Sequence, residues 1–224
     1  MNTHQTRVLD GISAMMAALP TTNWRLAIIS ADSNYAASNN VFPLVPGDTY
    51  ADAEAVYNNL GCPPREEGFD AAYEYMVNNA YAQTWMRYDA ALLIVFVSDE
   101  EEQSDAHFPV VGDFIDWYSH ERNGSVFLSS IINLDPTISL CNTSAYMNGD
   151  RYEEATDYFG GIIVDICAED WSAGVADASN QIEPYEYLEL TYVPIEESIR
   201  VFINASLNYD WSYSDADNTI YFTV

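Results

Sequence analysis

A group of oxygen-bearing side chains follows directly on the most apolar stretch of the chain. Seven consecutive apolar residues, 91–97, lead into Ser98 and Asp99, and three glutamates, Glu100 to Glu102, come next. Seven residues are too few to span a bilayer and suit a strand buried on both faces, as in a parallel sheet. An open α/β sheet binds ligands beyond the carboxyl ends of its strands, so this hydroxyl and these carboxylates predict a site for a cation or another ligand. The alternative is a solvated acidic loop.

The sequence gives little support for a catalytic site. His4 lies in a terminal stretch and His120 at a helix end, and only His107 falls close to the acidic run. Residues that act together in a triad are seldom adjacent in sequence, and paired glycosidic carboxylates need a substrate cleft between them. The chain contains neither of the glycine-rich phosphate-binding motifs. We therefore expect a protein that is not an enzyme.

The charge of the chain limits its partners. It has 35 acidic residues against seven arginines and no lysine, for a net charge of −28. Such a field repels nucleic acid and anionic membranes and attracts cations or basic surfaces. We expect no nucleic-acid binding, and no membrane insertion because no apolar run approaches about 18 residues. The N-terminus lacks the apolar core of a signal peptide, although an acidic surface suits a saline or extracellular setting.

Short apolar strands alternate with amphipathic helices over most of the chain. This alternation predicts a mostly parallel sheet with right-handed crossovers and helices around it, an α/β doubly wound fold. The 34–49 stretch is expected to be irregular, apart from a hairpin or edge strand at 41–45. The patterns predict strands at 24–30, 91–97, 125–132 and 162–166, and helices at 6–19, 52–60, 66–85, 108–120, 151–159 and 171–180.

From Glu183 the hydrophobic period changes from helical spacing to strict alternation. Two stretches show a period of two, which is typical of half-buried strands. Ile199, Val201 and Ile203 alternate with Arg200, Phe202 and Asn204, and Ile220, Phe222 and Val224 recur at every second position. We expect an α/β domain at 1–183 and a small antiparallel β module at 184–224. Because the alternation stops at Val224 in mid-pattern, we expect the module to be incomplete and the chain to be part of a longer protein.

In their order and spacing, these segments resemble a von Willebrand factor A (vWA) domain of the bacterial extracellular type. Residues 190–222 are similar to the short β module that often follows such domains. The resemblance implies a Rossmann-like doubly wound fold and a non-enzymatic role in adhesion or protein binding, at the cell surface or outside the cell. It is carried by WRLAIIS at 24–30, EEGFDAAYEYM at 66–76, LLIVFVSDEEEQSD at 92–105 and RYEEATDYFGGIIVDICAEDW at 151–171.

The ligand site of the vWA family is a metal-ion-dependent adhesion site. It combines a D-x-S-x-S loop after the first strand, a threonine before the third helix and an aspartate after the fourth strand. Asp99 matches the last element, with Ser98 beside it, so the resemblance implies that they hold Mg²⁺ or Ca²⁺ through oxygen. Glu100, Glu66 and Glu67 would form the rim, although no hydroxyl stands at the threonine position.

The first strand of the vWA pattern and its D-x-S-x-S loop are missing from this sequence. In the family, that strand lies between the strands that match residues 24–30 and 92–98 and pairs with both. Without it, two buried strand edges would carry unpaired backbone groups. Three explanations stay open: a gene start called too late, with Met1 as the methionine after the motif, a strand donated by a partner or neighbouring subunit, or a rearranged fold.

The three cysteines show no zinc-site spacing. The count alone leaves one disulfide with a free thiol, or three reduced thiols. Similar domains carry cysteines at the places of Cys141 and Cys167, so the resemblance implies a disulfide between these two and an unpaired Cys62. The competing hypothesis for the whole chain is a structural or assembly protein, in a surface appendage or virion, that uses a degenerate metal-free vWA fold.

Overall fold

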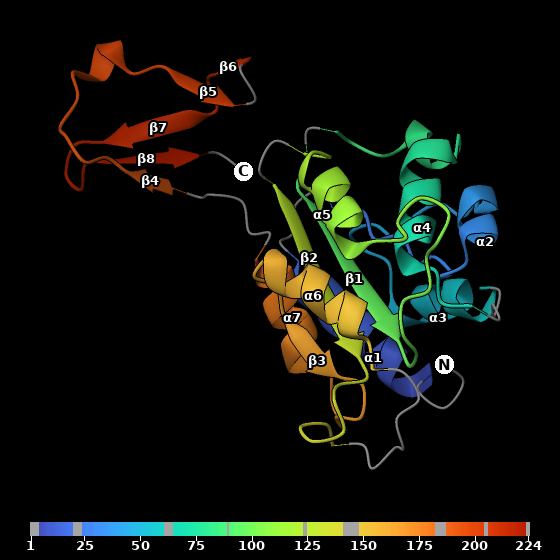
Figure 1. The fold of residues 1–224 in the computed structure, drawn as a ribbon. Coiled ribbons are helices and arrows are strands. Elements are labelled where there is room, and N and C mark those ends of the chain that lie inside the picture. The colour runs from blue at the N-terminus through green and yellow to red at the C-terminus, as the bar shows by residue number, and fades with distance from the viewer. Residues whose placement is uncertain are drawn as a thin grey trace. The chain divides into compact units, whose positions relative to one another are not determined.

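The chain divides into two compact units, Met1–Ile182 and Glu183–Val224. The sequence prediction puts this division after residue 183. The computed structural model describes residues 5–19, 24–60, 65–88, 90–122, 125–140, 148–181, 187–203 and 206–222. The first unit combines a parallel sheet with helices, and the second is a small antiparallel module (Figure 1).

A three-stranded parallel sheet runs through the first unit. Its strands are β1 (Leu92–Ser98), β2 (Val126–Ile132) and β3 (Ile163–Asp165), in the order β1-β2-β3. The register places Leu92 opposite Val126 and Ser98 opposite Ile132. The prediction of an α/β chain with a parallel sheet and a small antiparallel module is therefore confirmed.

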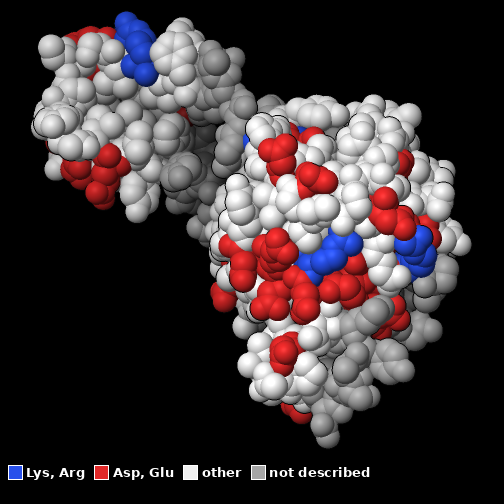
Figure 2. Space-filling model, viewed as in Figure 1, with Lys and Arg blue, Asp and Glu red and all other residues white. Residues whose placement is uncertain are grey.

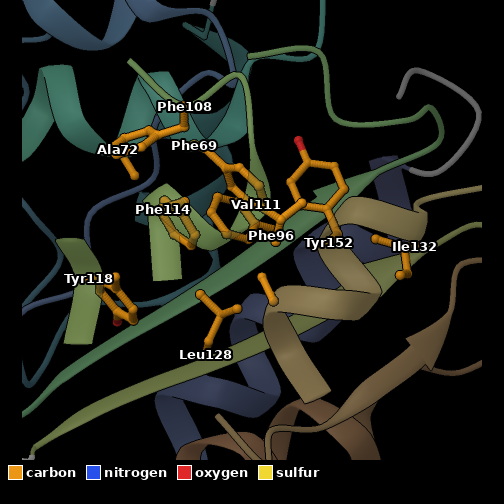
Figure 3. Packing of buried hydrophobic residues seen from close by; sticks show 11 residues of the cluster. Phe69, Ala72, Phe96, Phe108, Val111, Phe114, Tyr118, Leu128, Ile132 and Tyr152 are labelled. Atoms are coloured by element: carbon orange, nitrogen blue, oxygen red, sulfur yellow. The ribbon is translucent and has the colours of Figure 1, made fainter. Parts of the chain in front are cut away.

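Helices pack on both faces of this sheet. An aromatic core lies on one face, where α4, α5 and α6 contribute Phe69, Phe114 and Tyr152 (Figure 3). Phe69 stacks on Phe114 with ring centroids 4.0 Å apart. The helices are α1 (Gln5–Ala18), α2 (Ser33–Ser38), α3 (Tyr50–Asn58), α4 (Gly68–Tyr73), α5 (Val111–Ser119), α6 (Asp150–Tyr158) and α7 (Ser172–Asn180).

The opposite face of the sheet is covered by α1 and α7. Val8 and Met15 of α1, Val175 of α7 and Trp171 form a second apolar cluster with Ile131 of β2. Val95 and Val97 of β1 pack against this cluster, whereas Leu92, Ile94 and Phe96 belong to the aromatic side. Both faces of β1 are thus covered by apolar side chains, as its continuous apolar sequence requires.

The predicted strand at 24–30 is wrong. This segment forms only an isolated antiparallel bridge, in which Leu26 and Leu44 exchange two backbone hydrogen bonds of 2.9 Å. A strand needs a continuous ladder of backbone hydrogen bonds to a neighbouring strand. β1 does not supply this ladder, because it pairs with β2 alone in the described part of the sheet. The neighbour that would turn this segment into a strand is not among the described elements.

The long helix predicted at 66–85 is also wrong, because the chain there breaks into α4, the π-helical turn η2 (Glu74–Asn78) and the 3-10 turn η3 (Ala82–Thr84). The Asn79 side chain organises the break. Its amide nitrogen donates to the carbonyls of Ala36 and Asn39, and its oxygen accepts from the N–H groups of Tyr81 and Ala82. These bonds replace the helical ones that the helix would otherwise form.

One helix lies in the stretch that we expected to be irregular. Asp32 caps α2, since its carboxylate accepts from the N–H groups of Asn34 and Tyr35 at 2.9 and 3.1 Å. An aspartate before a short polar segment is a known helix-start signal, but the lack of an apolar period in Ser33–Ser38 hid this helix.

The described residues of the second unit form five short strands. They are β4 (Tyr187–Glu189), β5 (Val201–Ile203), β6 (Ser206–Asn208), β7 (Trp211–Ser214) and β8 (Thr219–Phe222), with the 3-10 turn η4 (Glu196–Ser198). They form an antiparallel sheet of order β4-β8-β7 and the separate pair β5-β6. Asn218 makes the turn into β8 with a φ of 54°. Val224, where the predicted alternation stops, lies outside the described residues.

No helix within the described ranges has the length and apolarity needed to cross a bilayer.

Gly161 allows the start of β3 to approach β2 closely. A Cβ atom there would collide with the backbone carbonyl of Leu128, which cannot move without disturbing the sheet. We expect Gly161→Ala to lower the free energy of unfolding by about 2–3 kcal/mol. Gly112→Ala in α5 is the control, because nothing lies within 4 Å of its added methyl group and alanine favours the helix. Chemical denaturation of both variants measures the difference, and equal stabilities would contradict the close approach.

Candidate functional site at the carboxyl end of β1

A buried carboxylate holds the loop that follows β1. Asp70 of α4 is only 1% exposed. Its Oδ2 accepts from the backbone N–H groups of Asp105 and Ala106 at 3.2 and 3.0 Å. Its Oδ1 accepts from those of His107 and Phe108 at 2.9 and 3.2 Å. Four backbone donors on one carboxylate fix the path of this loop against α4.

Glu102 and Arg151 form a second tie beneath the loop. The Glu102 side chain is fully buried and lies 3.1 Å from the Arg151 guanidinium. The same guanidinium donates to the backbone carbonyls of Glu102, Ser104 and Phe108. Burial raises the pKa of Glu102, and the Ser104 hydroxyl and Arg151 oppose the rise. Glu102 is therefore part of the loop's support.

The two residues predicted to hold a metal have different surroundings. Ser98 is 1% exposed, and its hydroxyl donates to the carbonyl of Glu100 at 2.9 Å and accepts from the Glu100 N–H at 3.1 Å. It closes a turn at the end of β1. Asp99 is half-buried, and its carbonyl accepts from the Asn133 side chain. This bond ties the end of β1 to the end of β2.

Of the three predicted rim residues, Glu66 and Glu100 lie near Asp99. Burial raises the pKa of Glu66 to about 7, and the negative charges of Asp99 and Glu100 add to the rise. Glu67 is engaged elsewhere, in an ion pair with Arg65 at 2.9 Å and a hydrogen bond from Ser33 at 2.9 Å. Glu66 thus lies within range of the charges of Asp99 and Glu100, whereas Glu67 is paired with Arg65 and Ser33.

Metal binding at Asp99 and Ser98 stays a prediction. No three His, Cys, Asp or Glu residues among them are grouped so that they could hold a metal ion. Ser98, the expected hydroxyl ligand, is engaged with the backbone of Glu100. We therefore base no function on Mg²⁺ or Ca²⁺ at this position.

The backbone edge of β1 that faces away from β2 is the other notable feature of this region. The Leu92 N–H donates to Ser125 beside β2. Because successive residues of a strand direct their backbone groups to opposite edges, those of Leu93, Val95 and Val97 point to the other edge. In the described part of the molecule, no strand pairs with β1 at that edge.

Segment 24–30 lies between the same helical layers as β1. Leu26 packs against the cluster of α1 and α7 that also receives Val95 and Val97 of β1. On the opposite side, α4 contributes Phe69 and Ala72 to the aromatic core over β1 and Ala71 to a cluster that covers Ala27 and Ile29. We call the position between segment 24–30 and β1, covered by α1 and α4, the strand slot.

Asp70 and Arg151 are two residues of this site that were not predicted from the sequence. A signal for each was present in hindsight. Asp70 is a lone acid among Phe69, Ala71 and Ala72, and Arg151 is one of only seven cations in the chain. It stands at the start of a helix, where the helix dipole disfavours a positive charge.

Comparison with known proteins gives no information about the function of this chain. No protein-family model, no curated protein and no solved structure matches this chain.

Cys167 is disulfide-bonded. The other two cysteines, Cys62 and Cys141, lie outside the described residues, so the predicted pairing of Cys141 with Cys167 stays a prediction.

We expect Asp70→Asn to lower the free energy of unfolding by about 3 kcal/mol, because an amide has one acceptor oxygen and its NH₂ group would face two backbone donors. Asp177→Asn is the control, since Asp177 is exposed on α7. Urea denaturation measures the stability of both variants. Equal stabilities would contradict the role of Asp70 in holding the loop.

The raised pKa of Glu66 predicts that the stability of the fold depends on pH. Because this pKa is about 7 in the folded chain against an ordinary 4.5, the folded state binds the proton more tightly than the unfolded state. The free energy of unfolding should therefore fall as the pH rises from about 4.5 to 7. In Glu66→Gln, we expect this decrease in the free energy of unfolding to be smaller by about 1–2 kcal/mol. This figure is reduced because Glu66 is partly exposed to solvent.

Glu54→Gln is the matched control for this pH dependence, because Glu54 is exposed on α3 and its loss changes the net charge equally. Stability curves at pH 5 and pH 7 provide the measurement. If the two variants show the same pH dependence, the raised pKa of Glu66 is contradicted.

Proposed function

We propose that this chain is a non-enzymatic protein-binding module that accepts an extended segment of a partner polypeptide as an additional strand beside β1. The observation that carries the proposal is the edge of β1 that faces away from β2. No strand among the described residues pairs with this edge, and helical layers cover both faces of β1. An exposed strand edge is a template for strand addition, in which backbone hydrogen bonds supply affinity and side-chain pockets supply specificity.

The sequence of β1 supports this role. Edge strands are commonly protected by charged residues, proline or a bulge. Residues 92–97 carry neither charge nor proline, and their pairing with β2 is continuous from Leu92 to Ser98. Such a sequence suits a central strand. β1 is nevertheless less buried than β2, since Leu92 to Val95 are all partly exposed whereas Leu128 to Ile132 are buried.

The proposed arrangement is vWA-like. In that arrangement β1, β2 and β3 take the places of the fourth, fifth and sixth strands, and segment 24–30 takes the place of the second. The donated strand would occupy the place of the first. This assignment is supported by the packing of segment 24–30 and β1, which both contact residues of α1 and α4.

We place the module outside the cytoplasm, at the cell surface or in the extracellular space. The disulfide at Cys167 supports this setting, because disulfides persist in oxidising compartments. The net charge of −28 is also compatible with it, since a saline medium screens the repulsion between carboxylates.

A second candidate is an assembly role, as a subunit of a surface appendage or virion. The observation that favours it is the apolar surface of the second unit, where Tyr192 is 84% and Tyr209 78% exposed. Side chains of this kind are enriched at protein interfaces. In this role, the β1 edge would receive a strand from a neighbouring subunit.

Proline substitution at the β1 edge tests the proposal. The N–H of Val95 points away from β2, so Val95→Pro should leave the β1–β2 ladder intact while it removes a donor from the open edge. The probe is a peptide of seven consecutive apolar residues with charged ends, matching the length of β1. We expect Val95→Pro to weaken binding of this peptide at least about tenfold, measured by fluorescence anisotropy.

Two controls separate binding from folding. Val95→Ala keeps the backbone N–H and should bind within about threefold of the original chain. Ile94→Pro removes an N–H on the β2 side and should destabilise the fold by about 3 kcal/mol or more. If Val95→Pro stays folded by circular dichroism and binds the peptide as well as Val95→Ala does, strand addition at this edge is contradicted.

A further inference from the structure

The strand slot has a direction, because segment 24–30 runs parallel to β1. At its start, the Arg25 guanidinium donates to the carbonyl of Trp85, in the segment that leads to the amino end of β1. At its end, the carbonyl of Ala31 accepts from the N–H of Glu67 at 2.7 Å. The adjacent Glu66 carbonyl accepts from Gln103, which follows the carboxyl end of β1. A strand between two parallel segments completes a parallel sheet when it runs the same way.

Arginine dominates the amino end of the strand slot. Arg25 is held against Trp85, and Arg87 precedes β1 by a few residues. Arg122 lies over the ring of Tyr88 with its guanidinium carbon 5.0 Å from the ring centroid. Three of the chain's seven arginines therefore lie near this end. Arg122 is buried and has Glu121 at 3.8 Å, so Arg25 and Arg87 are the two that give this end its positive charge.

Carboxylates dominate the carboxyl end. Asp99 and Glu100 follow β1, Glu66 is close enough to both for their charges to raise its pKa, and Asp32 follows segment 24–30. The two arginines near this end are already paired with carboxylates. Arg65 pairs with Glu67 and Asp105 at 2.9 and 3.2 Å, and Arg151 pairs with Glu102 at 3.1 Å. Acidic side chains also outnumber basic ones on the face of the first unit shown in Figure 2, where they gather over α6.

We infer that the partner segment is a parallel strand of about seven apolar residues with acidic residues before it and basic residues after it. The apolar requirement follows from the clusters on both faces of the strand slot, and β1 sets the length. The order of the flanking charges follows from the arginines at the amino end and the carboxylates at the carboxyl end, since complementary charges direct association and exclude wrong partners. This inference rests on the proposed function.

Two peptides of identical composition test the inference. One carries two glutamates before seven apolar residues and two lysines after them, and the other carries the lysines first and the glutamates last. We expect the glutamate-first peptide to bind the intact chain about tenfold more tightly at low salt. This preference should shrink at high salt, because screening weakens charge complementarity.

A spin label at the carboxyl end of the glutamate-first peptide reports the direction. We expect it to broaden the amide signals of Ser98 to Glu100 and to spare that of Leu92. The double variant Glu66→Gln/Glu100→Gln should lose most of the preference, whereas the exposed Glu54→Gln should keep it.

The outcomes distinguish the inference from the function on which it rests. Equal binding of the two peptides, tighter binding of the lysine-first peptide, or broadening at Leu92 would overturn the inferred polarity and leave strand addition intact. Binding of the lysine-first peptide that requires Mg²⁺ would overturn it too, because a metal would then bridge the carboxylates. If neither peptide binds, both the proposed function and the inference are wrong.

Discussion

The hydrogen-bonding requirement of β1 is the constraint on which the rest of the first unit depends. An apolar strand buried on both faces can satisfy its backbone only through neighbouring strands, since side chains and water are excluded from its faces. β2 satisfies one edge of β1. The layers formed by α1 and α4 continue past the other edge to segment 24–30. These layers would cover an added strand as completely as they cover β1, which distinguishes this edge from the exposed edge of an ordinary sheet.

The loop after β1 has a different basis for its structure. Polar groups fix its path up to Phe108, which belongs to the aromatic core. The Asp70 carboxylate accepts backbone N–H groups from one side, and the Arg151 guanidinium donates to backbone carbonyls from the other. Because both groups are held by helices, the carboxylates exposed on the loop keep defined positions despite their mutual repulsion. Acidic side chains that are held rigidly at the carboxyl end of the strand slot lose less conformational entropy when they bind a charged segment than the same side chains on a flexible loop would lose.

The charge distribution links these two features. A chain with a net charge of −28 would favour basic partners over its whole surface. Three of the seven arginines lie near the amino end of β1, whereas the arginines near its carboxyl end, Arg65 and Arg151, are paired with carboxylates. The net negative charge of the chain would therefore attract any cationic partner at long range. The order of charges along the strand slot would then select the orientation in which the partner segment binds.

The sequence by itself determined the strands β1 and β2, the helices α1, α3, α5, α6 and α7 and the change of pattern near residue 183, because these follow from local periodicity. It also placed Asp99 beyond the end of β1. Only the tertiary structure decided that 24–30 is not a strand, since a ladder depends on a neighbour far away in the chain. The break at Asn79 likewise depends on the distant carbonyls of Ala36 and Asn39. The supporting roles of Asp70, Glu102 and Arg151 were hidden for the same reason, because a buried polar group is defined by partners that local sequence does not name.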